Sequence, residues 1–288
     1  MGKLLGLEHE IIMGKNKNVM KAISTAIFLV VGLLNIFPFI FMVSSSFKLN
    51  ANVFEYPFRL IPKPFVSDAY MGLFASGSLF YRWYANTIVL VLVTLVLRIL
   101  LVGITAYSLA RLKYKGRDTL FFIFMLTLMI PQDMLIVPRY IVLYMLKLTN
   151  SMWSVSLIYT FEFFMVFLVR QFYISIPKEL SEAAIIDGCS HIRIFFSIIL
   201  PLSKPAMVTM ALFTFVWQWN DYTLPYTFIN DLKKQMISVG IKSFATEHTI
   251  DYSTQMAGAV LSLVPIIIVF LFVQKYFIEG IATSGIKG

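Results

Sequence analysis

Two long stretches of this sequence carry no charged residue, and they restrict the possible folds more than any other feature. They run from Ala22 to Phe47 and from Tyr252 to Gln274. A helix that crosses the roughly 30 Å hydrocarbon core of a bilayer needs about 20 apolar residues. Each stretch is therefore long enough to form one transmembrane helix.

Four further apolar stretches lie between these two, and each is interrupted by charges or prolines. Together the stretches predict six spans: Ala22–Phe47, Tyr84–Leu109, Leu120–Met145, Trp153–Phe172, Pro205–Phe228 and Tyr252–Gln274. The predicted fold class is all-α, a polytopic membrane protein with six transmembrane helices. We expect an N-terminal tail of residues 1–21, a transmembrane domain of residues 22–277 with a polar loop at 177–204, and a C-terminal tail of residues 278–288.

A cleaved signal peptide is the alternative interpretation of the first stretch. The apolar part of a signal peptide has roughly 7–15 residues, which is much shorter than this run. Glu8 and Glu10 also precede the run, where a signal peptide is basic. We therefore expect the stretch to be a retained span.

The composition supports a membrane protein over the soluble classes. Hydrophobic residues make up 59% of the chain and charged residues 14%, with a mean hydropathy of +0.80. In soluble domains, about 45–50% of the residues are apolar and about 25% are charged. The net charge of +9 comes from basic residues spread through loops, so no nucleic-acid partner is predicted. The single Cys189 excludes an intrachain disulfide, and three widely separated histidines predict no metal site.

The distribution of basic residues predicts the orientation in the membrane. Fourteen of the 24 lysine and arginine residues fall on the side that holds both termini and eight on the other side, while Arg98 and Arg139 lie inside spans. Cytoplasmic segments carry the excess of such residues. We therefore predict a multi-pass protein of the cell (inner) membrane with both termini in the cytoplasm.

Five ionisable side chains fall inside the predicted spans: Arg98, Asp133, Arg139, Glu162 and Asp221. A charge at membrane depth is costly unless it faces a partner or water. Two interpretations remain open for each, namely pairing between helices and the lining of a polar path. Asp133 and Arg139 are six residues apart, about 240° around a helix, so we expect them on different faces. Pro131 and Pro138 share a face, and each favours a kink.

The polar loop at 177–204 predicts two short helices on the cytoplasmic face. Glu179 and Glu182 suit the first turns of one helix, and Gly188 ends it because glycine tolerates positive φ. A second amphipathic segment, His191–Leu200, is expected to stop at Pro201. A helix that lies on the membrane surface with no protein partner is the alternative.

This loop carries a family resemblance. Glu182-Ala183-Ala184, Gly188 and Ile199-Leu200-Pro201 match the EAA signature of binding-protein-dependent ABC importer permeases. The segments RQFYISIPKELSEAAIIDG, LPLSKPA, WQWNDYTLP and MAGAVLSLVPIIIVFLFVQKYFIEGI are similar to the carbohydrate-importer branch, the group of the second membrane subunit of the maltose permease. Cys189 departs from the small residue that is usual there.

The resemblance implies that the loop is a cytoplasmic coupling helix, which docks in a groove of an ATPase subunit. The residues that it assigns to coupling are Glu182, Ala183, Ala184, Asp187, Gly188, Leu200 and Pro201. It also implies a heterodimer with a second permease subunit, two ATPase subunits that bind ATP and Mg, and an extracellular or periplasmic solute-binding protein. The chain has no G-x-x-x-x-G-K-[ST] phosphate loop, so we expect no enzymatic activity of its own.

The implied function is import of a sugar or oligosaccharide, driven by ATP hydrolysis in the partner subunits. A permease for another solute, such as a polyol, glycerol phosphate or peptide, is the alternative from the same superfamily. An intramembrane enzyme or a scaffold is the alternative from another class. No paired nucleophile and base or metal-ligand set supports an enzyme.

The residues expected to face a substrate lie in three spans: Trp219, Asn220, Asp221, Asp133 and Glu162. An indole can stack on a sugar ring, and amides and carboxylates can bind hydroxyl groups. Residues 219–221 point about 100° apart on a helix, so at most two of them can face a lumen together. An interfacial aromatic belt is the alternative, and the family's sugar contacts can also lie on the other permease subunit.

Overall fold

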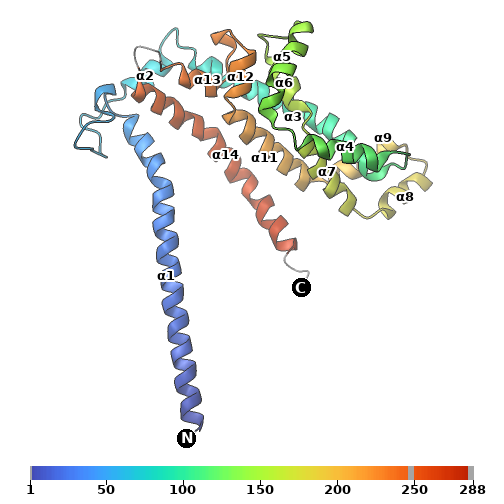
Figure 1. Ribbon diagram of the computed structural model, residues 1–288, viewed down its shortest axis with the longest axis horizontal. Coiled ribbons are helices and arrows are strands. Elements are labelled where there is room, and N and C mark those ends of the chain that lie inside the picture. Colours follow the sequence, from blue (N-terminus) through green and yellow to red (C-terminus); the bar gives the residue numbers. More distant parts are fainter. Residues whose placement is uncertain (1, 246–249, 285–288) are drawn as a thin grey trace. The chain divides into compact units, whose positions relative to one another are not determined.

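The computed structural model describes residues 2–245 and 250–284, in which helices are joined by turns and irregular segments and one isolated bridge joins Ala245 and Ile250. Three continuous helices are long and apolar enough to cross a membrane: α1 (Gly2–Ser45), α3 (Phe80–Arg111) and α14 (Tyr252–Ser284) (Figure 1). The all-α prediction is confirmed. The predicted tail at 1–21 is helical from Gly2, and residues 285–288 of the other tail lie outside the described residues.

Three further candidate spans are bent pairs of helices. They are α4 (Arg117–Thr127) with η2 (Gln132–Leu135) and α5 (Ile136–Met145), bent by 97°; α6 (Met152–Thr160) with α7 (Phe163–Ser175), bent by 41°; and α9 (His191–Ile194), η3 (Phe195–Ile199) and α10 (Leu200–Leu202) with α11 (Lys204–Asn220), bent by 78°. The described part of the chain thus holds three to six spans, depending on whether each bent pair crosses the membrane once.

The remaining helices are short. They are η1 (Asn50–Asn52), α2 (Asp68–Phe74), α8 (Glu179–Ile186), α12 (Thr223–Phe228), η4 (Leu232–Lys234) and α13 (Ile237–Lys242). The prediction of one span over Pro205–Phe228 was wrong in its second half, because α11 ends at Asn220. Asp221 adopts an extended backbone (φ −69°, ψ 125°) and separates α11 from α12.

The third predicted span, Leu120–Met145, is also not one helix. Pro131 is extended (ψ 130°) and separates α4 from η2, as its kink-forming chemistry predicts. Pro138 produces no kink, because it is the third residue of α5, where an N–H has no partner within the helix. The prediction that Asp133 and Arg139 lie on different faces of one helix was wrong, because the two residues lie in different elements.

The chain divides into two compact units. One holds the chain up to Met71 with Asp251–Val260, and the other holds Gly72–Ile250 with the chain from Leu261 onward. In the first unit, Asn50 accepts a hydrogen bond from the Tyr252 backbone N–H (2.8 Å), and Phe54 packs edge-on against the Tyr252 ring.

The second unit is organised around α3, which packs against α6, α7 and α11. Its core is formed by buried apolar side chains from these helices and from the loop at 177–204: Val102, Ala106, Met165, Val169, Tyr173, Ile194, Phe195, Ile199 and Met210. Gly103 permits the close approach of η3, because a Cβ there would lie 3.3 Å from the Phe195 ring. The core therefore holds the loop at 177–204 firmly against the helices that carry the charged residues.

Candidate functional site

Three interruptions of the helices line one cavity of about 630 Å³ in the second unit: the α4–η2 break, the α6–α7 break and the gap between α11 and α12. The first break contributes residues around Pro131, the second Phe161 and Glu162, and the third Asn220 and Asp221. The lining side chains are Arg98, Thr127, Leu128, Ile130, Gln132, Asp133, Leu135, Arg139, Ile158, Tyr159, Phe161, Glu162, Phe163, Val216, Trp217, Gln218, Asn220, Asp221, Thr223 and Leu224. All five charged residues predicted at membrane depth thus meet at this cavity.

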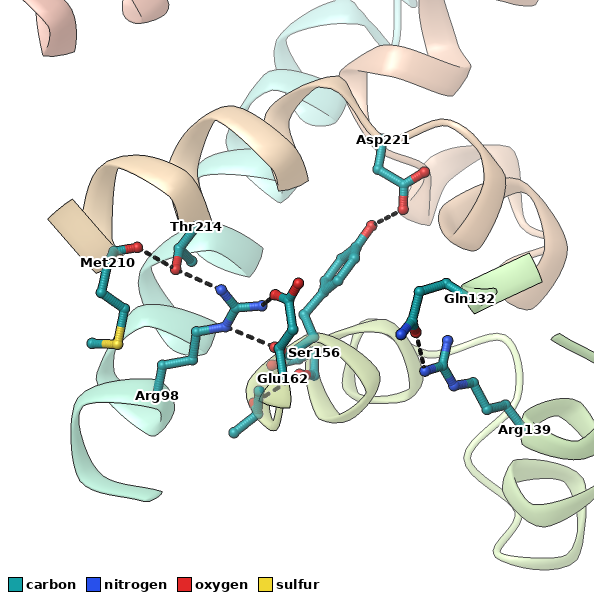
Figure 2. A network of polar contacts seen from close by, with 10 residues as sticks. Arg98, Gln132, Arg139, Ser156, Glu162, Met210, Thr214 and Asp221 are labelled. Carbon is teal, nitrogen blue, oxygen red and sulfur yellow. Dashed lines mark hydrogen bonds and ion pairs between the residues drawn. The ribbon is translucent and has the colours of Figure 1, made fainter. Parts of the chain in front are cut away.

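Arg98 of α3 holds the break between α6 and α7. Its guanidinium donates from Nη2 to Glu162 Oε2 (2.6 Å), from Nε to the Tyr159 carbonyl (2.7 Å) and from Nη1 to Thr214 Oγ1 (2.8 Å) (Figure 2). Glu162 has an extended backbone between the two helices, so nearby carbonyl groups lose their helical partners. Only 2% of the Arg98 side chain is exposed. Helix pairing, one of the two interpretations, therefore accounts for Arg98.

Asp221 ends α11 and forms part of the cavity wall. Its carboxylate accepts hydrogen bonds from the Tyr159 hydroxyl and, at 2.8 Å, from the Thr223 backbone N–H. The second contact is an Asx-type turn, which competes with continuation of the helix. The Asp221 carbonyl accepts from Ser238 Oγ at 2.6 Å. The carboxylate thus has protein partners and also lies on the cavity wall.

Asp133 and Arg139 lie on the same cavity although the helical wheel separates them. Asp133 is in the 3₁₀ helix η2 and Arg139 is in α5, so the spacing of a single α-helix does not apply, and both side chains line the cavity. Arg139 donates a hydrogen bond to the Gln132 side-chain oxygen (Figure 2). Asp133 is exposed and forms no ion pair among the described residues.

Of the two tryptophans of α11, the cavity is lined by Trp217 and not by Trp219, the one expected to face it. Trp219 is 1% exposed and does not line the cavity, because its Nε1 donates to Ser262 (3.0 Å) and its ring stacks on Phe215. Trp217 lines the cavity and is 42% exposed. Asn220 also lines it and donates to the Val216 carbonyl at 2.7 Å. Of residues 219–221, two line the cavity, but the helical spacing does not decide this because Asp221 lies outside α11.

Gln218 is a cavity residue that sequence reasoning missed. Only 1% of it is exposed, and neither Nε2 nor Oε1 has a hydrogen-bond partner among the described residues. The sequence did contain a signal, because Gln218 is a polar amide between two tryptophans in an otherwise apolar span. Its burial without a partner could not be read from the sequence.

The loop at 177–204 forms the predicted helix–turn–helix. The helix α8 begins with Glu179 and Glu182 in its first turn. Gly188 has φ +77°, the left-handed conformation expected of it, and its N–H donates to the Ile185 carbonyl (3.0 Å). Ser190 caps α9 by accepting from the Arg193 N–H at 3.3 Å.

The residues assigned to coupling divide into an exposed group and an anchoring residue. The exposed residues are Glu182, Ala183, Asp187, Gly188 and Pro201, whereas Leu200 is half-buried and Ala184 is the buried residue of α8. Exposed Ile185 and Ile186 add an apolar surface.

Pro201 does not stop the second helix of this loop, contrary to expectation. It lies inside α10, directly after a π-helical turn at Phe195–Ile199. Such a turn widens the helix and accommodates a residue that lacks an N–H. The helix ends one residue later at Leu202.

No group of three His, Cys, Asp or Glu side chains that could hold a metal ion occurs among the described residues, which leave out His248. The cavity instead offers guanidinium, carboxylate, amide and aromatic groups around a polar space. Such groups bind a polar solute and provide no nucleophile–base pair.

Comparisons with known proteins agree with this arrangement. Residues 99–283 match the family described as binding-protein-dependent transport system inner membrane component. The arabinooligosaccharides transport system permease protein AraQ of Halalkalibacterium halodurans is 30% identical over 276 residues, which cover 95% of this chain and 99% of the relative. The maltodextrin transport system permease protein MdxG of Bacillus subtilis is 30% identical over 275 residues, covering 94% and 98%.

A solved structure shares the fold over most of the chain. It is that of a bacterial ABC transporter involved in the import of the acidic polysaccharide alginate, with a TM-score of 0.81 and 25% sequence identity. The match covers 90% of this chain and 97% of that chain.

Proposed function

The chain belongs to the family of binding-protein-dependent transport system inner membrane components, and we propose that it is the permease subunit of an ABC importer for sugars or oligosaccharides. It is a multi-pass cell-membrane protein, and nucleotide is bound by separate ATPase subunits. The cavity at the three helix breaks is the observation that carries the proposal, because broken helices supply polar groups at membrane depth. The relatives named for arabinooligosaccharides and maltodextrin support carbohydrate over a polyol, glycerol phosphate or peptide.

Uptake by cells tests this function directly. A strain that lacks this subunit should lose uptake of one labelled sugar from a panel, and the wild-type gene should restore it. Restoration should be weaker with Asn220→Ala, in a complex that assembles normally, if the cavity carries the substrate. Loss of a polyol or peptide instead, with all sugars unaffected, would contradict the carbohydrate assignment.

The proposed path is formed by Asn220, Asp221, Asp133 and Glu162, all of which line the cavity. In this proposal Trp219 supports the end of α11 from behind the wall through its bond to Ser262. Its replacement by alanine should therefore lower the yield of the complex without changing the half-saturation constant for sugar. Asn220→Ala should raise that constant by about five- to thirtyfold, the equivalent of one lost hydrogen bond of about 1–2 kcal/mol.

The proposed complex has a second permease subunit, two ATPase subunits and a solute-binding protein outside the membrane. We place both termini and residues 177–204 in the cytoplasm, where the basic residues are concentrated. In a Cys189→Ala background, an impermeant thiol reagent should label a cysteine at Asn52 and miss one at Lys115. Labelling of position 115 from outside would contradict the orientation.

The coupling role belongs to the exposed surface of α8 and the turn after it. Glu182 stands beside exposed Ile185 and Ile186, a combination that suits an apolar groove with a polar rim. Glu182→Lys should reduce co-purification of the ATPase subunit or ATP-driven uptake, because it reverses the charge at the contact. Glu179→Lys is the matched control, since it also removes an exposed acid from the first turn of α8. If both variants reduce co-purification and uptake equally, the loss reflects a change in α8 itself and not a contact made by Glu182.

A further inference from the structure

We infer that the cavity accepts an uncharged sugar unit and that the Gln218 amide is the group that hydrogen-bonds its hydroxyls. The inference rests on the proposed function and specifies its substrate class. It separates this chain from the alginate importer whose fold it shares, because alginate is acidic.

The charges on the cavity wall disfavour an acidic sugar. Three carboxylates line it, those of Asp133, Glu162 and Asp221, against the two guanidinium groups of Arg98 and Arg139. The Arg98 guanidinium is already bound on all three of its nitrogens, by one carboxylate, one carbonyl and one hydroxyl. The Arg98 and Glu162 charges thus offset each other. A uronate would meet the two remaining carboxylates of the wall with only the Arg139 guanidinium to offset their repulsion. Like charges in a space sheltered from water repel strongly.

The unpaired amide of Gln218 points to a ligand that both donates and accepts. Its Nε2 and Oε1 are buried without partners among the described residues, a costly state that native proteins rarely keep without a reason. A sugar hydroxyl can donate to Oε1 and accept from Nε2, whereas a carboxylate can only accept. Both amide atoms are covered in this conformation, so a ligand reaches them when side chains of the wall move. Alternating access requires movement at such a site.

The wall also offers an apolar surface for a sugar ring. Trp217 lines the cavity beside Gln218 and is packed against Phe213 and Phe164, with ring centroids 5.1 and 5.8 Å away. Its indole is held in place by these contacts while part of it stays exposed. Phe161 lines the cavity as well and is exposed. The C–H face of a neutral pyranose or furanose suits such a surface, and its hydroxyls suit the amide.

Direct binding to the assembled transporter tests the inference without the selectivity of the solute-binding protein. The purified complex is dialysed to equilibrium against labelled neutral arabinooligosaccharides or maltodextrins and, separately, against oligogalacturonides of the same length. We expect a neutral sugar to bind and Gln218→Met to weaken its binding about five- to thirtyfold, with thermal stability unchanged or higher because an unpaired buried amide is removed.

Gln235→Met is the matched control for a buried glutamine. Its Nε2 donates to the Pro225 and Ile229 carbonyls, and it does not line the cavity. This variant should lower thermal stability and leave sugar binding unchanged. Asp133→Asn should improve oligogalacturonide binding relative to the parent, because it removes an exposed carboxylate from the wall.

Three results would overturn the inference: no neutral sugar bound, oligogalacturonides bound as tightly as neutral sugars by the parent, or equal binding by Gln218→Met and the parent. None of these affects the proposed function, which is judged by sugar uptake in cells that lack the subunit. Loss of that uptake together with a failed binding test would place the sugar contacts on the partner permease.

Discussion

The ion pair between Arg98 and Glu162 offers a quantitative test of how a broken span is held together. The Arg98 side chain is 2% exposed and that of Glu162 is 30% exposed. Removing one partner of a buried pair costs about 3–5 kcal/mol, because the other charge stays buried. Since water reaches part of Glu162, we expect Arg98→Met to cost about 3 kcal/mol, near the lower limit.

The replacement of Glu162 should cost less. Glu162→Gln keeps an oxygen that accepts from Arg98 but leaves the buried guanidinium without its counter-charge, so we expect about 2 kcal/mol. The double variant no longer leaves an unpaired charge. Its destabilisation should therefore fall short of the sum of the single variants by about 1–3 kcal/mol.

Unfolding of the purified subunit by SDS in mixed micelles measures these free energies. The pair Arg117–Asp118 is the control, because its side chains are 29% and 75% exposed. Arg117→Met should cost less than about 1 kcal/mol. If the Arg98 and Glu162 variants add within about 0.5 kcal/mol, or if Arg98→Met costs no more than Arg117→Met, the pair does not hold the break.

Three further predictions concern two glycines whose backbone restricts the side chain and one carboxylate whose pKa is shifted by hydrogen bonds. Gly240→Ala should lower the thermal stability of the complex, because its Cβ would lie 2.1 Å from the Trp83 ring, whereas Gly72→Ala, with no atom within 4 Å, should not. Gly188→Val should reduce ATPase co-purification, and Gly188→Asn should retain more of it, because asparagine tolerates φ +77° better; equal defects would argue against backbone strain. Burial raises the pKa of Asp251, but hydrogen bonds from Ser253 and Thr254 outweigh it and leave the pKa below its usual value. Because the pKa is lower in the folded state, this stabilisation is complete above the unfolded-state pKa and disappears as the pH falls through the folded-state pKa. Asp251→Asn should flatten that part of the acid unfolding curve measured by circular dichroism, and an unchanged curve would contradict it.

The uninterrupted helices could be predicted closely from the sequence. The span expected at Tyr84–Leu109 is α3, Phe80–Arg111, and the span expected from Tyr252 begins there. Hydropathy identifies such segments because a continuous helix satisfies its own backbone groups in lipid. The turn at Gly188 was equally accessible, since few residues other than glycine adopt its φ without strain.

The helix breaks were harder to predict, because hydropathy does not measure backbone continuity. Pro131 gave a local signal, whereas the break at Glu162 contains no proline or glycine. That break depends on Arg98, which is 64 residues away in the sequence and binds both the Glu162 carboxylate and the Tyr159 carbonyl. The placement of Trp219 behind the wall likewise depends on Ser262, 43 residues away. No window of local sequence contains such partners.

The two interpretations of charges at membrane depth, pairing and path lining, prove to be compatible in this structure. Asp221 accepts from a backbone N–H at a helix break, and Glu162 pairs with the arginine that binds a carbonyl at another break. The same two carboxylates line the cavity. Substitution of either residue therefore changes folding and the cavity together, so loss of transport alone cannot assign its role. Gln218 and Asp133 differ, because neither has a hydrogen-bond or ion-pair partner assigned among the described residues. Their variants leave the held breaks intact, and these are the positions at which substrate binding can be separated from stability.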